Sequence, residues 1–360
     1  MKPYRTEVIT EWLRETDPDR VEQLRREADL VRKNAVGDVV YLRGLLEFSN
    51  HCRRNCCYCG LRRDNNEIGR YRMTREEILD CVAKAYARGY GTVVLQSGQD
   101  NDVDTMWMGE IVRKIKKAYP LAVALSLGVR DEDEYIYWRD MGADRYILRF
   151  ETSDLELLYK IHPVPREDLP RRIELLSILK GMGYQVGGGI LVGLPGQTYT
   201  SVANDIELFA KLDLDMVALR PYVPHPQTPL GKDFLKKKQW VDDQIPNDDM
   251  STLKVIALTR IMCPEANIPA TNALASIDPC GFKDGLRFGA NMNMPNMTPR
   301  KYRRLHKMHP NAVLQSSENL YVEILEAIED AGRYPGHGRG DRVKRQHPKL
   351  KPPEGCGQPA

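Results

Sequence analysis

The sequence predicts an α/β protein built as a closed (β/α)8 barrel of the TIM type, with an N-terminal helical cap. From residue 40 onward, short runs rich in β-branched residues alternate with amphipathic segments of helical period. Eight such runs with helices between them favour parallel strand pairing and closure of the sheet on itself. A chain of 360 residues is long enough for one barrel of this kind. A doubly wound open sheet is the alternative.

The predicted elements follow in order along the chain. Residues 6–35 place apolar side chains at helical spacing and form the expected cap. Helices are expected at Thr74–Arg88, Val103–Ala118 and Leu169–Met182. The expected strands are Leu45–Ser49, Thr92–Ser97, Ala122–Leu127, Arg145–Glu151, Gln185–Val192, Met216–Tyr222, Ile268–Asn272 and Ala290–Met294.

The chain divides into three parts by composition. We expect a helical extension at 1–40, the barrel at 41–330 and a basic, Gly- and Pro-rich tail at 331–360. In the tail, seven Lys and Arg residues stand against Asp341 and Glu354, which predicts an irregular extension that faces solvent or a partner. The tail has no aromatic interleaving and no binding motif, so a nucleic-acid partner is not expected.

Composition also indicates the cellular compartment. No apolar run approaches the ~18 residues of a membrane span, and the first residues lack the apolar core of a signal peptide. Cysteine is sparse, with 8 in 360 residues, so a disulfide framework is not expected. We therefore expect a cytoplasmic protein with no membrane partner, whose thiols stay reduced and can bind iron.

One stretch carries the strongest functional signal. Cys52, Cys56 and Cys59 stand at C-x3-C-x2-C spacing, with Tyr58 directly before the third. Thiolates are the usual protein ligands of a 4Fe–4S cluster, so three of them can bind three irons and leave the fourth iron to a ligand that is not protein. S-adenosylmethionine (SAM) binds such an iron through its amino and carboxylate groups. Its sulfonium then accepts an electron, and SAM cleaves to a 5′-deoxyadenosyl radical.

Other interpretations of these cysteines are weaker. A zinc site normally has a second pair of ligands downstream, whereas the remaining cysteines (Cys81, Cys263, Cys280 and Cys356) are single and scattered. Cys57 would allow a C-x4-C-x-C spacing instead. We interpret it as a packing residue, because the Tyr-Cys pair matches the SAM-binding pattern only when Cys59 is the third ligand.

Polar or glycine-rich clusters follow several other predicted strands, at the end of the barrel where active sites lie. Residues 96–100 suit a contact with the SAM amino group, or an ordinary turn. Glu151 at a buried strand end needs a partner, either on SAM or in Arg149. Glycines at 187–189 suit a close approach of adenine. His225 lies among prolines and is more typical of a rigid loop than of a ligand.

These segments together resemble the HydE family of radical SAM maturases of FeFe-hydrogenase, in the wider group with biotin synthase and methylornithine synthase. The resemblance spans about residues 45 to 305, which is the whole predicted barrel. The matching segments are FSN-x-CRRNCCYCGLRRDN, RYRMT, VVLQSGQD, LSLG, ADRYILRFET, GGGILVGLPGQT, PHPQTPL, ALTRIMCPEANIPAT and GANMNMPNMTP. CGLRRDN and NIPAT are more specific than the cysteine triplet, which indicates only the superfamily.

The resemblance implies a role for each matching residue. By motif position Cys52, Cys56 and Cys59 are the cluster ligands. SAM would be surrounded by Tyr58, Ser97, Gly98, Gln99, Ser126, Glu151, Arg172, Gly193, Leu194 and Pro195. The substrate cavity would be lined by Arg145, Arg149, Met216, Thr271, Asn272 and Met294. Two arginines in that cavity suit an anionic substrate with a carboxylate. Arg172 could instead be a surface arginine beside Arg171.

The family also implies a reaction and partners. Its proposed substrate is a cysteine-bound Fe(CO)2(CN) unit from the companion maturase HydG, and the radical is thought to attack the cysteine sulfur. Reduced ferredoxin or flavodoxin would donate the electron, and other hydrogenase maturases would be partners. A paralogue acting on a small amino acid or thiol, such as a methylornithine synthase-type mutase, is the alternative. A non-catalytic iron–sulfur scaffold is disfavoured, because it needs neither a free iron nor the GLPG segment.

Three departures from the family stand out. Gln99 replaces a glutamate, which removes a negative charge near the SAM ammonium. Asn272 replaces a threonine at the cavity, which bears on the identity of the substrate. Ala312–Asp330 contains no cysteine and Cys356 stands alone, so the accessory cluster of some members is not expected here.

Overall fold

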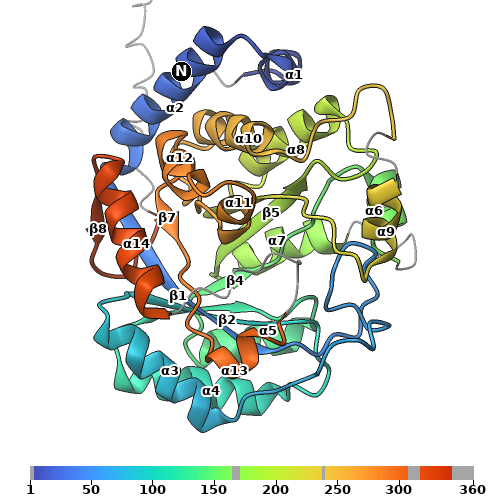
Figure 1. Cartoon of the computed structure of the whole chain (residues 1–360). Coiled ribbons are helices and arrows are strands. Elements are labelled where there is room, and N and C mark those ends of the chain that lie inside the picture. Colours follow the sequence, from blue (N-terminus) through green and yellow to red (C-terminus); the bar gives the residue numbers. More distant parts are fainter. Residues whose placement is uncertain (1–3, 164–170, 237–239, 307–316, 343–360) are drawn as a thin grey trace, which may run out of the picture.

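The computed structural model describes residues 4–163, 171–236, 240–306 and 317–342, and its strands form one curled parallel sheet (Figure 1). The strand order is β6-β5-β4-β3-β2-β1-β7, which is sequence order around the barrel. The bounds are β1 (Val39–Ser49), β2 (Thr92–Ser97), β3 (Ala122–Ser126), β4 (Arg145–Ile147), β5 (Gln185–Val192), β6 (Met216–Pro221) and β7 (Met292–Asn293). The predicted barrel is confirmed, and the doubly wound sheet is excluded.

Residues 267–270 fill the seventh position and complete the ring between β6 and β7. Asn267 forms a parallel bridge with Met216, and Pro269 forms one with Met292. The predicted strand Ile268–Asn272 is therefore reduced to two isolated bridges. Its extended backbone ends early because Thr271 already caps the next helix, α11 (Asn272–Ile277), and accepts from the amide of Leu274.

Helices surround the sheet because each carries one apolar face toward it. Their starts follow local capping rules: Thr74 and Glu77 form a capping box on α3, and Asp104 caps α4. The barrel helices are α3 (Arg75–Ala87), α4 (Thr105–Ala118), α5 (Glu132–Asp140), α6 (Leu155–Ile161), α7 (Arg171–Gly181), α8 (Tyr199–Lys211), α9 (Pro229–Lys236), α10 (Asp249–Met262), α12 (Gly281–Arg287), α13 (Arg300–Arg303) and α14 (Ser317–Asp330).

The N-terminal cap forms α1 (Thr6–Arg14) and α2 (Pro18–Val36), as predicted for residues 6–35. Both helices lie on the outer helical layer, where α1 packs on α8 and α2 packs on α10 (Figure 1). Buried Lys254 of α10 donates to the carbonyl of Glu15 at 2.9 Å and so fixes the link between the two. No helix in the described ranges is long and apolar enough to cross a membrane.

The barrel interior is filled in layers along the strands. The middle layer is apolar and consists of Leu45, Val94, Ala124, Ile147, Met216, Ala218 and Met292, with Met294 packed against them. Inward side chains two residues further along the strands are polar and include Glu47, Gln96 and Arg149. Two residues earlier, at the other end, Arg43 and Arg145 point to the barrel floor.

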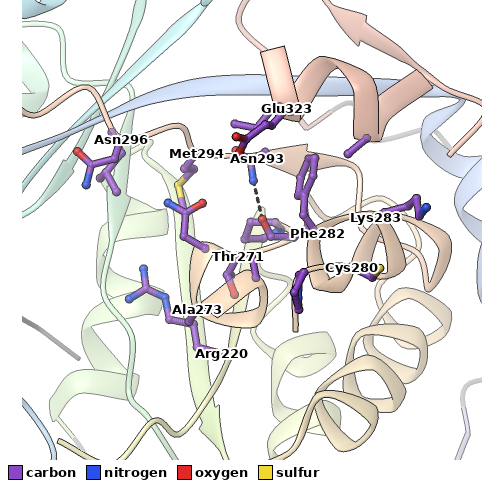
Figure 2. A pocket seen from close by; sticks show the side chains of 18 of the residues that line it. Arg220, Thr271, Ala273, Cys280, Phe282, Lys283, Asn293, Met294, Asn296 and Glu323 are labelled. Carbon is purple, nitrogen blue, oxygen red and sulfur yellow. Dashed lines mark hydrogen bonds between the residues drawn. The ribbon is translucent and has the colours of Figure 1, made fainter. Parts of the chain in front are cut away.

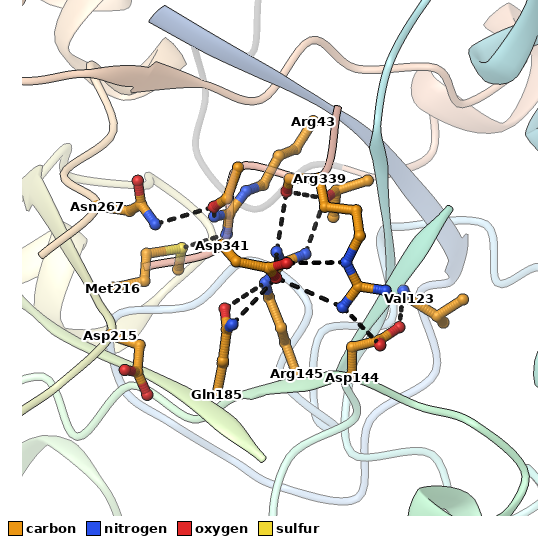
Figure 3. A network of polar contacts seen from close by, with 12 residues as sticks. Arg43, Val123, Asp144, Arg145, Gln185, Asp215, Met216, Asn267, Arg339 and Asp341 are labelled. Atoms are coloured by element: carbon orange, nitrogen blue, oxygen red, sulfur yellow. Dashed lines mark hydrogen bonds and ion pairs between the residues drawn. The ribbon is translucent and has the colours of Figure 1, made fainter. Parts of the chain in front are cut away.

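The C-terminal residues 334–342 close this floor (Figure 3). β8 (Tyr334–Gly336) pairs in parallel with the start of β1, and Gly338 bridges Tyr90. Asp341 then accepts from Arg145 at 2.6 Å and from Gln185 at 3.0 Å, while Arg339 donates to Asp144 at 2.8 Å. The tail was expected to face solvent or a partner, but residues 334–342 pack at the barrel floor and include one short strand. Residues 343–360 lie outside the described residues.

Candidate active site

The cysteine loop follows β1 at the carboxyl end of the barrel. Cys52, Cys56 and Cys59 all line one cavity of about 170 Å³. Cys57 does not line it: its backbone amide donates to Ile161 of α6 and its carbonyl accepts from Leu230 of α9. Cys57 is thus set apart from the three cysteines that line the cavity.

Burial dominates the electrostatics of these thiols. It raises the pKa of Cys56 well above its usual value and that of Cys59 to about 12. Repulsion from the Cys59 thiolate adds to the shift of Cys56, and repulsion from the Cys52 thiolate adds to the shift of Cys59. His162, after α6, places Nδ1 2.8 Å from the sulfur of Cys56. Burial lowers the pKa of His162 well below its usual value, so this imidazole is neutral. The neutral thiols need a cationic partner before they ionise, as metal binding provides.

The described residues include no group of three or more His, Cys, Asp or Glu side chains that could hold a single metal ion. A mononuclear zinc site therefore gains no support. The cavity with three thiols on its wall suits a cluster instead, because each thiolate of a 4Fe–4S cluster binds a different iron.

The exit of β2 packs directly against the cysteine loop. A Cβ at Gly98 would lie 2.2 Å from the carbonyl oxygen of His51 and 2.7 Å from the Cβ of Cys52, so only glycine allows this approach. Gln99 accepts from Arg54 at 2.9 Å and donates to the carbonyl of Val129 at 2.7 Å. The residue that departs from the family thus fixes Arg54 of the loop.

The exit of β4 brings an acid and two arginines to the cavity wall. Arg149 and Glu151 pair at 3.2 Å, while Arg149 Nη1 and Glu151 Oε2 are buried without a partner among the described residues. Glu151 holds a left-handed backbone with φ of 69°, which is strained for a residue with a Cβ. Arg172, on the first turn of α7, donates to the carbonyl of Arg149 at 2.6 Å. Buried atoms without partners are where a polar ligand fits.

Most of the predicted SAM residues meet around this one cavity. Its wall includes Tyr58, Ser97, Gly98, Gln99, Ser126, Glu151 and Arg172, together with Arg149 from the predicted substrate set. Gly193, Leu194 and Pro195 are not among the lining residues. A Cβ at Gly193 would lie 2.2 Å from Asn247 Cα. Glycine is therefore required here because a neighbouring loop approaches closely. Leu194 is buried in a small apolar cluster with Leu157 and with Leu191, which itself lines the cavity.

A second cavity of about 350 Å³ lies between the barrel and helices α11, α12 and α14 (Figure 2). Thr271, Asn272 and Met294 of the predicted substrate set line it. Arg220, Ala273 and His306 line both cavities, so the two adjoin at these residues. Buried Asn293 donates to the carbonyl of Ala270 at 2.8 Å, and its Oδ1 has no partner in the described part of the chain.

Two predicted substrate residues lie elsewhere. Arg145 and Met216 line neither cavity of the described chain. Every nitrogen of Arg145 has an acceptor at the floor, in Gln185, Thr92 and the 339–341 segment. Met216 is in the apolar middle layer, where its sulfur lies 3.6 Å from Arg43 Nη1. Both begin their strands, so they lie away from the strand ends that the cysteine loop follows.

Arg220, which was not predicted as a substrate residue, takes the place expected for Arg145. It ends β6 between the two cavities. Burial, and then the like charge of Arg149, lower the pKa of Arg220 to about 9. Two arginines this close favour an anion between or beside them. The sequence did contain a signal for this role. Arg220 lies two residues after Ala218, as Arg149 lies two after Ile147, so both side chains point inward one layer above the apolar layer.

Glu47 and His306 were also missed. Glu47 of β1 faces the second cavity, accepts from Asn296 at 2.9 Å and lies 3.5 Å from His306 Nε2. Tyr71 donates to the Glu47 carbonyl at 2.7 Å. His306 is more than 250 residues away in the chain, so no local motif links the two. His225, in contrast, lines neither cavity, and its Nδ1 accepts from the amide of Gln227 at 3.1 Å within its own loop.

Known proteins share this chain's sequence and fold. The Radical SAM superfamily profile matches residues 46–209. The FeFe hydrogenase maturase subunit HydE of Thermotoga maritima is 42% identical over 345 residues, covering 95% of each chain. The chain belongs to the radical SAM superfamily, and within it to the HydE family.

More distant relatives agree with this membership. The 3-methylornithine synthase of Methanosarcina acetivorans is 30% identical over 88% of this radical SAM chain and 86% of its own. The crystal structure of methylornithine synthase (PylB) superposes with a TM-score of 0.76 at 25% identity, covering 93% of this chain and 95% of that one. The maturase HydG of Carboxydothermus hydrogenoformans has the same fold, with a TM-score of 0.78 at 19% identity, covering 93% and 76%.

Membership makes the protein a radical SAM enzyme, which implies a 4Fe–4S cluster and SAM as cofactors. The site fits both in chemical type. Three thiols face one cavity for the cluster, and the orphaned Glu151 Oε2 and Arg149 Nη1 offer an acceptor and a donor to a zwitterionic ligand.

Proposed function

We propose that the protein cleaves SAM reductively to assemble the di-iron site of FeFe-hydrogenase, in the manner of HydE. The observation that carries this proposal is the cavity lined jointly by Cys52, Cys56, Cys59 and Glu151, whose Oε2 has no partner in the described part of the chain. The 42% identity to HydE over 95% of both chains supports the choice within the superfamily. When bound by the three cysteines, a 4Fe–4S cluster supplies the electron that cleaves SAM to a 5′-deoxyadenosyl radical.

The surrounding side chains would orient SAM. Glu151 Oε2 accepts a hydrogen bond from a hydroxyl or ammonium, and Arg172 at the wall offers a cation to a carboxylate. Gln99 gives the ammonium no charge, and its amide is engaged by Arg54 and Val129. We therefore expect binding of the SAM amino group to depend on other acceptors at the wall, including backbone carbonyls.

The substrate would lie where the two cavities adjoin. Arg149 and Arg220 attract an anion, which suits a cysteine-bound Fe(CO)2(CN) complex with its carboxylate and cyanide. Thr271, Asn272 and Met294 line the adjoining cavity and would set its shape. Burial in the barrel top excludes water from the reacting centre. Reduced ferredoxin or flavodoxin is the proposed electron donor, other hydrogenase maturases are the proposed partners, and a reducing cytoplasm is the proposed location.

The deciding experiment uses anaerobically reconstituted, dithionite-reduced protein with SAM, with and without the iron complex. We expect 5′-deoxyadenosine or an adenosyl–sulfur adduct to form in an amount that depends on the complex. The matched control is Cys56→Ala, which should form neither product. SAM cleavage that ignores the complex would reject the maturase assignment and retain the radical enzyme.

A mutase acting on an amino acid is the second candidate. It is supported by the 30% identity to 3-methylornithine synthase and by the superposition on PylB. Asn272, a departure from HydE at the second cavity, is compatible with a different substrate. The same reduced protein incubated with SAM and a panel of amino acids would distinguish it, because an isomerised amino acid would form without any iron complex.

A further inference from the structure

Residues 69–73, which follow the cysteine loop, run antiparallel to the end of β1. Ser49 and Arg72 form an antiparallel bridge, and the amide of Met73 donates to Phe48 at 2.8 Å. Asn50 completes the pairing, because its Oδ1 accepts from the Tyr71 amide at 2.7 Å. We call residues 69–73 the strap. Since side chains alternate along an extended segment, Arg70 and Arg72 share one face of it.

Arg72 joins the strap to the exit of β2. It pairs with buried Asp100 at 2.7 Å, and the same carboxylate oxygen accepts from Ser49 at 2.7 Å. Asp100 follows directly after Gln99, whose carbonyl accepts from the Arg53 amide at 2.8 Å. The strap, the β2 exit and the first part of the cysteine loop are therefore connected by hydrogen bonds.

Arg70 makes the more unusual contacts. Its Nη1 donates to the carbonyl of Asn50 at 2.7 Å and to that of Leu61 at 2.9 Å. Its Nη2 donates to the carbonyls of Arg62 at 2.7 Å and Asn65 at 3.1 Å. Asn50 lies two residues before the first cysteine, and Leu61 lies two after the third. One guanidinium thus joins the two ends of the loop that carries all three thiols.

The acceptors of Arg70 are carbonyls, and no carboxylate forms an ion pair with it within the described ranges. A surface arginine would instead pair with an acid, as Arg63 does with Asp64 in the same loop. The charge of Arg70 is therefore not neutralised locally. It acts on Cys52 and Cys59, whose thiolates would raise the pKa of Arg70 against the lowering effect of its burial.

We propose that Arg70 is the positioning residue of the cysteine loop: its guanidinium fixes the span between the two loop ends and keeps a positive charge beside Cys52 and Cys59. This inference rests on the proposed cluster binding by the three cysteines, and not on the identity of the substrate. Two effects should follow. The loop should retain its cluster longer, and the nearby cation should raise the reduction potential of a cluster with thiolate ligands.

The test separates geometry from charge with two substitutions. Arg70→Lys keeps the charge but loses the forked donor, and Arg70→Gln loses both. On reconstituted full-length protein we expect about tenfold faster cluster loss to a chelator in both variants, because charge-assisted hydrogen bonds are lost. We expect a more negative midpoint potential in Arg70→Gln, and a potential near that of the wild type in Arg70→Lys. Arg63→Gln is the matched control and should change neither.

A readout without the cluster keeps this inference distinct from the proposed function. In the apo protein, hydrogen exchange of a peptide covering residues 50–65 should be faster in both Arg70 variants, and exchange in α4 should be unchanged. Wild-type exchange and wild-type cluster retention in Arg70→Gln would overturn the inference. If the wild-type chain binds a cluster but cleaves no SAM, the proposed function is rejected. The role of Arg70 is still decided by cluster retention, midpoint potential and hydrogen exchange in its variants.

Discussion

Each end of the barrel interior contains buried arginines, but the two ends differ in how fully these arginines are hydrogen-bonded. Arg145 begins β4 at the floor, is only 4% exposed in its side chain, and has an acceptor for every nitrogen. Arg149, four residues further along the same strand direction, pairs only at 3.2 Å with Glu151 and leaves Nη1 without a partner among the described residues. The network around Arg145 is complete, although Arg43 Nε nearby is buried without a partner among the described residues, whereas the network around Arg149 borders a cavity in which a ligand would complete it.

This difference shows how a buried arginine can be assigned to structure or to binding. A buried charge must be neutralised, either by the chain itself or by what it binds. At the floor the chain supplies Asp341 (Figure 3). At the top, Arg149 pairs with Glu151, whose charge also favours the charged form of Arg220, and both arginines line a cavity. Unpaired atoms that border a cavity identify the functional end, since Arg43 Nε at the floor is also unpaired among the described residues but lines neither cavity.

The largest effect is expected from a substitution that disrupts only the top of the barrel. Cys56→Ala should abolish both the EPR signal of the reduced cluster and SAM cleavage, because it removes a thiol from the cavity wall. Cys57→Ala is the matched neighbour and should keep the signal, since Cys57 does not line the cavity. Loss of the signal in both variants would contradict the proposed ligand set.

Arg145 of β4 and Arg149, two residues after that strand ends, provide the sharpest comparison. Arg149→Met should lower kcat/KM for an anionic substrate by about 10- to 100-fold, since one charged hydrogen-bonding partner is worth ~1.5–3 kcal/mol. Arg145→Met should leave kcat/KM of the folded enzyme unchanged and lower the thermal midpoint instead. Steady-state kinetics and thermal melts of both variants measure this. A kinetic defect in Arg145→Met with normal stability would instead support the original prediction that Arg145 contacts the substrate.

At the floor, Asp341→Asn should destabilise the protein by about 2 kcal/mol. This is less than the cost of breaking a fully buried ion pair, because Asp341 is partly exposed. Burial alone would raise the pKa of Asp341, but Arg339 and Arg145 lower it below its usual value. This stability is therefore present above pH ~4 and lost as pH falls below that. Urea titrations at pH 7 and pH 3 should show the difference between variant and wild type shrinking in acid.

A carboxyl group near the top of the barrel should make the free energy of unfolding depend on pH in the opposite direction. Asp205 of α8 is fully buried and accepts from the amide of Ser153 at 2.6 Å, two residues after Glu151. Burial raises its pKa to about 7. The folded state therefore holds a proton that the unfolded chain has released, and stability falls as pH rises from about 4 to 7.

Asp205→Asn should remove this slope. Its unfolding free energy should vary less between pH 5 and pH 8 than that of the wild type. An unchanged slope would mean that another group titrates in this window.

The sequence by itself determined the fold class, most strand positions and the cysteine loop. Thr92–Ser97 and Gln185–Val192 were predicted with their observed bounds, because hydrophobic runs and turn residues are local signals. Cys52, Cys56 and Cys59 were likewise fixed by spacing within eight residues. In a parallel barrel, residues after successive strands meet at one end, so the wall of the first cavity could also be anticipated.

Only the tertiary structure decided what depends on distant parts of the chain. Local sequence does not show that Asp341 reaches Arg145 across 196 residues, nor that Asn247 occupies the space beside Gly193. Arg145 and Arg149 have the same strand alternation, and their roles differ because one meets the C-terminal segment and the other meets a cavity. Charge pairing and close packing are long-range in sequence, whereas periodicity and ligand spacing are short-range.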